Sequence, residues 1–367
     1  MRRIDQLAGP LLLRALALFR RRGNPPPGDL RAIGILCAVP LGDLLISLSG
    51  MIPALRAKFP HARIIAFNAG FSRGAFALLP RVDKQITISL GNPLGAAALL
   101  RQEKLDVLID LSQWANITAI LSVLSGARHT IGFDTPHCAR GRGYDTGVPH
   151  LDTRHELANY AALVKPLGIA QISEPALRLP QAEVEQVRQR HADRYMVFHA
   201  WPSGINKHLK QWPAAHWRAL AEKFIALGYA VVFTGAQGDR AATQALIDGL
   251  PASSKARAIN AAGSLSLRET ALLIQGSAGL VSVNTGIMHI GAALDVPMAA
   301  LHGPTNPLRW GPLSRKARVL IPSGPDVAYL NLGWEYPPGA QETLPRLSVD
   351  EVFDSMLAMQ RQSRQGD

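Results

Sequence analysis

The feature that most constrains the fold of this chain is a regular alternation of short apolar runs with helix-like stretches. After the first run, apolar side chains recur at spacings of three and four residues, as on one face of a helix, at Leu45, Leu48, Ile52 and Leu55. Strands separated by helices need crossover connections, which predicts a parallel sheet with helices on its faces. In the first half of the chain, the strand-like runs are residues 32–38, 64–67, 85–88, 107–111 and 130–133.

The alternation weakens near residues 168–179 and then restarts, so we expect two α/β domains, which also suits a length of 367 residues. The strand-like runs of the second half are residues 195–200, 230–234, 279–283 and 298–301. The expected divisions are a basic amphipathic segment with a Pro-rich spacer, an N-terminal domain, a C-terminal domain and a final helix with a tail, at residues 1–29, 30–175, 185–345 and 346–367.

Composition limits the kinds of partner. The chain has 39 Lys and Arg against 27 Asp and Glu, a formal charge of +12, which favours an anionic substrate, membrane or nucleic acid. Aromatic residues are only 6% and are not interleaved with the basic ones, so we expect no nucleic-acid partner. Two cysteines exclude a disulfide framework, and no P-loop or G-x-G-x-x-G turn follows the first strand.

The N-terminus raises the question of membrane contact. Residues 7–19 are mostly apolar but contain Pro10 and Arg14, and arginines flank them on both sides, at Arg2, Arg3, Arg20, Arg21 and Arg22. Two interpretations stay open: a basic amphipathic helix on an anionic leaflet, or a basic tail without a partner. A stiff spacer of three prolines, residues 25–27, precedes the folded part.

Polar residues follow several of the predicted strands, where ligands gather in open α/β sheets. Asp43 comes after the first strand at the start of a helix, so its carboxylate is either a base or a helix cap. Asp110 ends another strand and has the same two interpretations.

Two loops of the second half resemble phosphate sites. Residues 203–213 form a polar loop with Gly204 and Lys210 before a helix, which is either a phosphate site or a solvated basic loop. Asn284, Thr285 and Gly286 turn a strand sharply into a helix that carries His289. This turn is either a pyrophosphate cradle or an ordinary cap with a core histidine.

Taken together, these segments resemble glycosyltransferase family 9, the bacterial heptosyltransferases of lipopolysaccharide synthesis, from about residue 33 to residue 312. The resemblance depends on four stretches, of which the last two are specific: Pro40-Leu41-Gly42-Asp43-Leu44-Leu45; Asp106-Val107-Leu108-Ile109-Asp110-Leu111 with Ile131-Gly132-Phe133; His199 with Lys210-Gln211-Trp212-Pro213 and Trp217; and Asn284-Thr285-Gly286-Ile287-Met288-His289 with Gly303-Pro304-Thr305-Asn306-Pro307.

The resemblance implies a GT-B fold, in which two Rossmann-like domains face each other across a cleft. It implies an inverting, metal-independent transfer of a sugar, with Asp43 as base and no cofactor besides a nucleotide-sugar donor, for which we expect ADP-heptose. The donor-binding residues implied or suggested are Lys210, Ser203, Asp239, Asn284, Thr285, Gly286 and His289. Asn284 stands where well-known members have aspartate, and the stretch between His199 and Lys210 is longer than theirs.

The acceptor expected from the resemblance is an anionic lipid-linked saccharide, handled in the cytoplasm at the inner face of the inner membrane. Candidate acceptor contacts are Arg73, Arg140 and Arg142, for which ordinary surface arginines are the alternative. Two other functions remain open: a nucleotide-sugar epimerase of the same fold, and an inactive basic adaptor that binds RNA or membrane.

Overall fold

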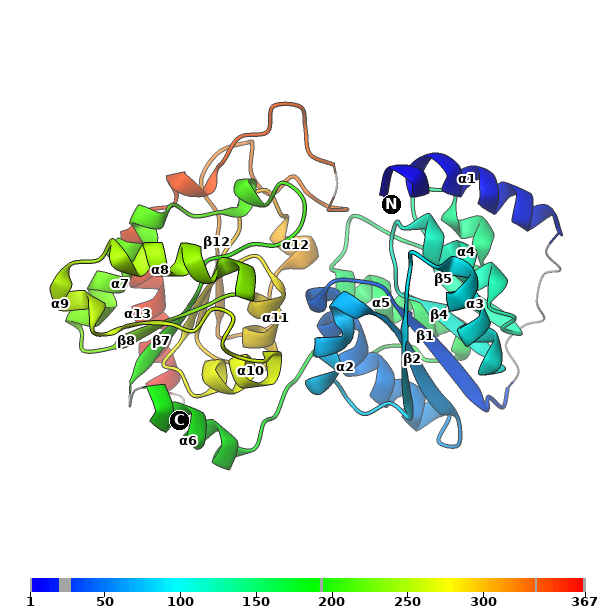
Figure 1. Cartoon of the computed structure of the whole chain (residues 1–367), viewed down its shortest axis with the longest axis horizontal. Helices are drawn as coiled ribbons and strands as arrows, with labels where there is room; N and C mark the ends of the chain where they lie inside the picture. Colours follow the sequence, from blue (N-terminus) through cyan, green and yellow to red (C-terminus); the bar gives the residue numbers. More distant parts are fainter. Residues whose placement is uncertain (1, 20–27, 192–193, 334, 366–367) are drawn as a thin grey trace. The chain divides into compact units, whose positions relative to one another are not determined.

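The computed structural model describes residues 2–19, 28–191, 194–333 and 335–365, which form two compact units (Figure 1). The first unit spans residues 1–174 and the second spans residues 175–367. The N-terminal helix belongs to the first unit and the C-terminal helix to the second. No helix in the described residues is both long and apolar enough to cross a bilayer.

The first unit contains a six-stranded sheet in the order β3-β2-β1-β4-β5-β6, and every pairing in it is parallel. The central strand β1 is buried along its whole length, as its continuous apolar sequence predicts. The strands are β1 (Ala32–Cys37), β2 (Arg63–Ala69), β3 (Lys84–Ile88), β4 (Val107–Asp110), β5 (His129–Asp134) and β6 (Thr146–Pro149); the helices are α1 (Arg2–Phe19), α2 (Leu41–Lys58), α3 (Pro93–Gln102), α4 (Asn116–Leu124) and α5 (Glu156–Val164), with 3-10 turns η1 (Gly70–Ala77), η2 (Arg140–Gly143) and η3 (Lys165–Leu167).

The second unit repeats this plan with the order β12-β11-β10-β7-β8-β9, again all parallel. Its strands are β7 (Tyr195–His199), β8 (Ala230–Thr234), β9 (Ala258–Asn260), β10 (Leu280–Val283), β11 (Met298–Leu301) and β12 (Ala317–Leu320). Its helices are α6 (Gln181–His191), α7 (Ala214–Ala226), α8 (Arg240–Asp248), α9 (Ala252–Lys255), α10 (Leu267–Gln275), α11 (Gly286–Ala293), α12 (Pro307–Trp310) and α13 (Val349–Gln365), with 3-10 turns η4 (Lys207–Lys210), η5 (Gln237–Asp239) and η6 (Leu344–Arg346).

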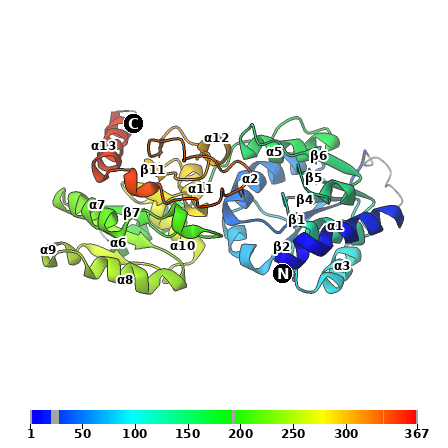
Figure 2. The same ribbon diagram turned by 90° about the horizontal axis from the view of Figure 1, so that it is seen from above.

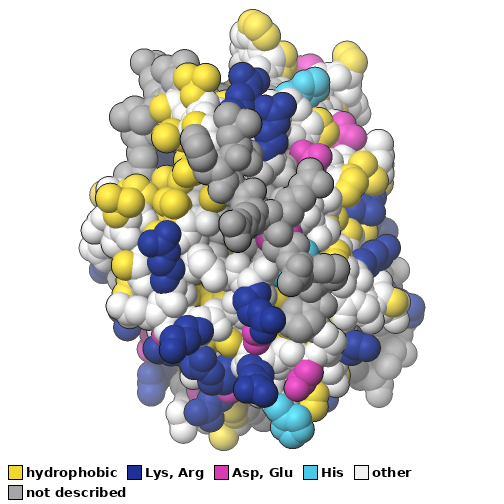
Figure 3. All heavy atoms as spheres, turned by 90° about the vertical axis from the view of Figure 1, so that its right-hand side faces the viewer, with side chains coloured by type: hydrophobic (Ala, Val, Ile, Leu, Met, Phe, Trp, Pro, Cys, Tyr) yellow, Lys and Arg dark blue, Asp and Glu magenta, His cyan; other side chains and the backbone are white. Residues whose placement is uncertain are grey.

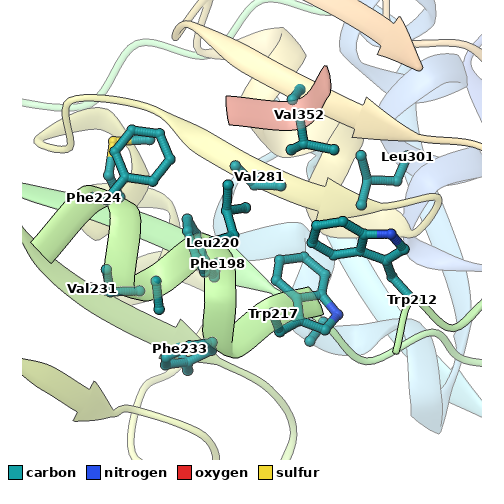
Figure 4. Close-up of a cluster of buried hydrophobic side chains, with 14 of the residues drawn as sticks. Phe198, Trp212, Trp217, Leu220, Phe224, Val231, Phe233, Val281, Leu301 and Val352 are labelled. Atoms are coloured by element: carbon teal, nitrogen blue, oxygen red, sulfur yellow. The ribbon is translucent and has the colours of Figure 1, made fainter. Parts of the chain in front are cut away.

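An aromatic core lies between the sheet and the helices of the second unit (Figure 4). Phe198 on β7 meets Phe233 on β8 edge to face at 5.5 Å, and the ring of Trp212 meets that of Trp217 at 5.2 Å. Helix α13 adds Val352 and other apolar side chains to this core. The last helix therefore covers the second unit, a point that the sequence left open.

Helix α1 lies along the surface of the first unit (Figures 1 and 2). Leu13 is fully buried in a cluster with Ala119 and Ile120 of α4. The Asp5 carboxylate accepts hydrogen bonds from the backbone N–H groups of Asn116 (3.0 Å) and Ile117 (2.7 Å), so it caps α4. The segment is therefore a docked helix rather than a loose tail. The side chains of Arg2 and Arg3, the arginines 20–22 and the prolines 25–27 lie outside the described residues.

Candidate functional site

Each sheet has one place where its strand order reverses, and polar residues of the chain gather there. The reversal lies between β1 and β4 in the first unit and between β7 and β10 in the second. The connections that leave two such strands run to opposite faces of the sheet, which opens a crevice at their carboxyl ends. Asp43 follows β1, whereas Lys210 follows β7 and the turn at Thr285 follows β10.

Asp43 is buried in the first turn of α2, and its carboxylate is held by neutral donors from distant segments. Gln113, in the loop after β4, donates from Nε2 to Asp43 Oδ1 at 3.0 Å. Tyr160 on α5 donates its hydroxyl to the same oxygen at 2.9 Å. The helix start is not capped by a side chain, since Pro40 occupies the cap position. The structure thus favours a positioned carboxylate over a simple cap.

The same cluster extends to a second carboxylate. Glu156 at the start of α5 is fully buried and accepts from Gln113 Nε2 at 2.8 Å. His150 Nε2 lies 2.9 Å from Glu156 Oε1, and Asn159 donates to Oε2 at 2.9 Å. Gln113 is anchored in turn because its backbone carbonyl accepts from the hydroxyl of Thr135. Sequence reasoning missed this cluster; the one available signal was the i, i+4 spacing of Glu156 and Tyr160.

Arg140 is a correction to the predicted acceptor contacts. Its side chain is fully buried, and Nη2 lies 3.0 Å from Oδ2 of the buried Asp110. The hydroxyl of Tyr144 donates to the same oxygen at 2.6 Å. Burial alone would lower the pKa of Arg140, but Tyr144 and Asp110 raise it above its usual value. Arg140 therefore neutralises Asp110 inside the unit and is not available to an acceptor, and Asp110 is a structural carboxylate.

The other two arginines proposed for the acceptor are exposed. Arg73 lies on η1, after β2, and Arg142 lies on η2, after β5. Both side chains are thus accessible to a ligand, unlike Arg140.

In the second unit, Lys210 ends η4 and is half-buried, which lowers the pKa of its ammonium group. Its charge also acts on His302, at the end of β11. Burial first, and then Lys210, lower the pKa of His302 to about 4. His302 Nδ1 lies 3.2 Å from the carbonyl oxygen of Thr305, so Nδ1 carries the proton and Nε2 is a bare acceptor.

Asn284 lies beside this neutral histidine. Its Nδ2 is 3.4 Å from His302 Nε2, a contact that an aspartate could not make with an unprotonated acceptor. Thr285 is the N-cap of α11 but makes no side-chain cap bond. Among the described residues, buried hydroxyls without a hydrogen-bond partner include those of Thr285, Thr305 and Thr343. A Cβ on Gly303 would lie 3.1 Å from Thr343 Oγ1, which places this hydroxyl beside the same loop.

The remaining donor candidates lie around this group. Gly286 opens α11, and His289 is buried one turn further along it. Ser203 is exposed in the loop after β7. The Asp239 carboxylate accepts a hydrogen bond from the backbone N–H of Ala236 at 2.8 Å, so its Oδ2 atom is engaged in the local turn. In the described part of the chain, no group of three or more His, Cys, Asp or Glu side chains could hold a metal ion.

Comparison with known proteins identifies the family. The profile described as glycosyltransferase family 9 (heptosyltransferase) matches residues 96–328. The chain is 38% identical over 300 residues to lipooligosaccharide heptosyltransferase 2 of Haemophilus influenzae, and 28% identical over 299 residues to lipopolysaccharide heptosyltransferase 2 of Escherichia coli. In each case, the match covers 76% of this chain and 85% of the relative.

Solved structures agree on the fold. The structure of E. coli ADP-heptose lps heptosyltransferase II matches with a TM-score of 0.75 at 23% identity, covering 91% of this chain and 99% of that one. A family 9 glycosyltransferase from Veillonella parvula matches equally well, at 21% identity over 92% of this chain and 100% of that one. The two parallel sheets and these likenesses confirm the GT-B fold expected from the sequence. The chain belongs to glycosyltransferase family 9 and is a glycosyltransferase.

Proposed function

We propose that this enzyme transfers heptose from ADP-heptose to a lipopolysaccharide-type acceptor, with inversion at the anomeric carbon and without a metal ion. The relatives named above are heptosyltransferases of lipopolysaccharide or lipooligosaccharide. The observation that carries the chemical proposal is the buried Asp43 carboxylate, held by Gln113 and Tyr160 where the first sheet reverses its strand order.

In this mechanism, Asp43 acts as the general base. It takes the proton of an acceptor hydroxyl while that oxygen attacks the anomeric carbon of the donor. The bond from that carbon to the diphosphate oxygen breaks, and its electron pair leaves with the nucleoside diphosphate. A single displacement of this kind inverts the anomeric centre and needs one base.

Residues of the second unit stabilise the negative charge that develops on the leaving diphosphate. Lys210 supplies a half-buried cation, and the first turn of α11 at Gly286 presents N–H groups that no side chain caps. The unpartnered hydroxyls of Thr285, Thr305 and Thr343 are suited to donate to phosphate oxygens. Asn284, His289, Ser203 and Asp239 complete the proposed donor site.

The base is tested by Asp43→Asn. We expect transfer to fall roughly 10²–10⁴-fold, because the amide cannot accept the proton, while ADP-heptose binding stays unchanged. Asp29→Asn, which alters an exposed carboxylate of the same unit, is the matched control. Near-normal turnover of Asp43→Asn in a radiolabelled transfer assay would show that Asp43 is not the general base.

The phosphate role is tested by Lys210→Ala. Loss of a charge-assisted bond of about 1.5–3 kcal/mol weakens ADP binding roughly 10- to 100-fold in calorimetry. Lys207→Ala removes an exposed lysine from the same turn and leaves the affinity unchanged. Equal affinities for the two variants would refute the role of Lys210.

We also propose that the enzyme works in the cytoplasm, peripherally on the inner face of the inner membrane, with the outer face of α1 against the anionic leaflet. Leu11 and Leu12 are 65% and 50% exposed beside the exposed Arg14, whereas Leu13 holds the helix on the unit. Lys and Arg side chains outnumber Asp and Glu on the described surface in Figure 3. Apolar side chains beside basic ones suit a bilayer interface. Arg73 and Arg142 are the proposed contacts to the anionic acceptor.

Vesicle sedimentation tests the membrane proposal. We expect binding to vesicles rich in phosphatidylglycerol, weaker binding to pure phosphatidylcholine, and a loss of binding when both Leu11 and Leu12 are replaced by Gln. Leu94→Gln alters another exposed leucine of the first unit and serves as control. If the double variant sediments with anionic vesicles as well as the wild type does, α1 is not the contact surface.

A further inference from the structure

The amide of Gln113 lies between two carboxylates that come from different helices. Its Nε2 donates to Asp43 Oδ1 at 3.0 Å and to Glu156 Oε1 at 2.8 Å, and all three side chains are buried. We propose that Gln113 and Tyr160 are positioning residues for the Asp43 base, and that Glu156, acting through Gln113 and through its charge, keeps that base reactive. This inference rests on the proposed role of Asp43.

Tyr160 is a permanent donor in this arrangement. Burial, together with the charges of Asp43 and Glu156, raises the pKa of its phenol well above the usual value. The hydroxyl therefore stays protonated across the working range and donates to Asp43. Gln113 and Tyr160 both contact Oδ1, so they fix the rotation of the carboxylate about its Cβ–Cγ bond.

The two carboxylates fix which way the Gln113 amide faces. An amide can present either nitrogen or oxygen to its neighbours, and two carboxylates on one side favour the nitrogen. Asp43 alone favours the same orientation, so the Gln113 donor to the base is kept when Glu156 is replaced by Gln.

Neutral side chains donate to the Glu156 carboxylate, which lies near Asp43. Gln113 donates to Oε1 at 2.8 Å and Asn159 donates to Oε2 at 2.9 Å. His150 Nε2 lies 2.9 Å from Oε1. A like charge opposes the ionised form of a neighbouring carboxylate, whereas hydrogen-bond donors favour it.

Two further charged groups lie around this cluster: Arg154, whose Nε donates to Asn159 Oδ1 at 2.7 Å, and Asp110 at the end of β4. Asp110 there is paired with Arg140 and with the hydroxyl of Tyr144, so its charge is compensated locally. Two kinds of influence on Asp43 can therefore be removed one at a time. One is the hydrogen bonds that Tyr160 and Gln113 donate, and the other is the negative charge of Glu156. They act in opposite directions.

This opposition gives a test in the pH dependence of kcat/KM, which reports the ionisation of the free enzyme. Tyr160→Phe removes one donor to the base, so the acid limb of the profile moves to higher pH by about one unit. Glu156→Gln removes the like charge, so the acid limb moves to lower pH. Because neither residue is proposed to touch the donor, the KM for ADP-heptose stays unchanged in both variants.

Two further variants guard the interpretation. Tyr195→Phe removes a buried hydroxyl that donates to the Leu273 carbonyl oxygen in the second unit, so it loses a comparable bond without moving the profile. Gln113→Leu removes the bridge between the carboxylates, and we expect kcat to fall at least tenfold while the KM for ADP-heptose is kept. If Glu156→Gln does not fold, Gln113→Leu with Tyr160→Phe decides the question.

The outcomes distinguish failure of this inference from failure of the proposed function. Profiles of Tyr160→Phe and Tyr195→Phe that superimpose on the wild type, or shifts of Tyr160→Phe and Glu156→Gln in the same direction, would overturn the inference. A normal kcat for Gln113→Leu would overturn it as well. Absence of transfer by the wild type from ADP-heptose would instead contradict the proposed function.

Discussion

Replacement of Arg140 by Met tests whether this residue is structural, as its position implies. The side chains of Arg140 and Asp110 are both fully buried, with 3.0 Å between Nη2 and Oδ2. Arg140 Nη1 also donates to the Ala115 carbonyl oxygen at 2.9 Å, and Nε donates to that of Phe133 at 3.2 Å. Arg140→Met leaves Asp110 as a buried charge without its cation and removes one donor from each of two backbone carbonyl groups.

Breaking a buried pair in this way costs about 3–5 kcal/mol. For a unit of this size, each kcal/mol lowers the melting temperature by roughly 2–4 °C, so we expect a decrease of roughly 6–20 °C. Thermal unfolding followed by circular dichroism measures the change. Arg142→Met, two residues away and exposed, should leave the melting temperature nearly unchanged.

A double variant separates loss of the pair from loss of packing. Asp110→Asn together with Arg140→Met removes the buried charge, so it should recover a substantial part of the lost stability. An Arg140→Met protein that melts with the wild type but shows a raised KM for the acceptor would refute the reasoning and restore Arg140 as a binding residue.

Three further perturbations follow from particular contacts. The pKa of His302 is about 4 in the folded chain against a usual 6.5, so on acidification the unfolded state binds this proton first. The contribution of His302 to the free energy of unfolding is therefore complete above pH 6.5 and decreases toward pH 4. His302→Gln should flatten this pH dependence, measured by urea titrations. Asp5→Ala should cost about 1–2 kcal/mol through loss of the α4 cap, whereas Asp5→Asn, which keeps an acceptor, should cost less; equal losses would show that the cap is not the cause. Gly50→Ala places a Cβ 2.2 Å from the Ser173 carbonyl oxygen, so an overpacking cost of about 1–3 kcal/mol should exceed the gain in helix propensity. Gly70→Ala is the control, because a Cβ there meets no atom within 4 Å. A stabilised Gly50→Ala protein would contradict this packing.

The strands that the sequence revealed are mostly those that the sheets bury. β1, β7 and β10 are buried at every position, and apart from His199 and Ser282 their residues are apolar. The three strands that it missed, β6, β9 and β12, are all edge strands and are partly exposed. An edge strand pairs on one side only and needs no continuous apolar run, so its sequence resembles that of a loop.

The residues of the site also divide into those that the sequence identified and those that it did not. Asp43, Lys210 and the turn at Thr285 were recognisable because each follows a predicted strand and lies in a motif of the family. The interior position of Arg140 was not recognisable, since nothing in its glycine-containing segment distinguishes a buried arginine from an exposed one. The contact between Gln113 and Glu156 left no signal either, because 43 residues separate them along the chain.

The sequence by itself determined the two α/β halves, the family and the residues that follow its central strands, because burial on both faces and short motifs leave local patterns. The tertiary structure alone decided which polar groups meet. It brought Gln113 and Tyr160 to Asp43, buried Arg140 against Asp110 and docked α1 through Asp5. Such pairings depend on strand order and on helix packing between distant segments, and a hydrogen bond formed across 70 or 117 residues leaves no periodicity in the chain.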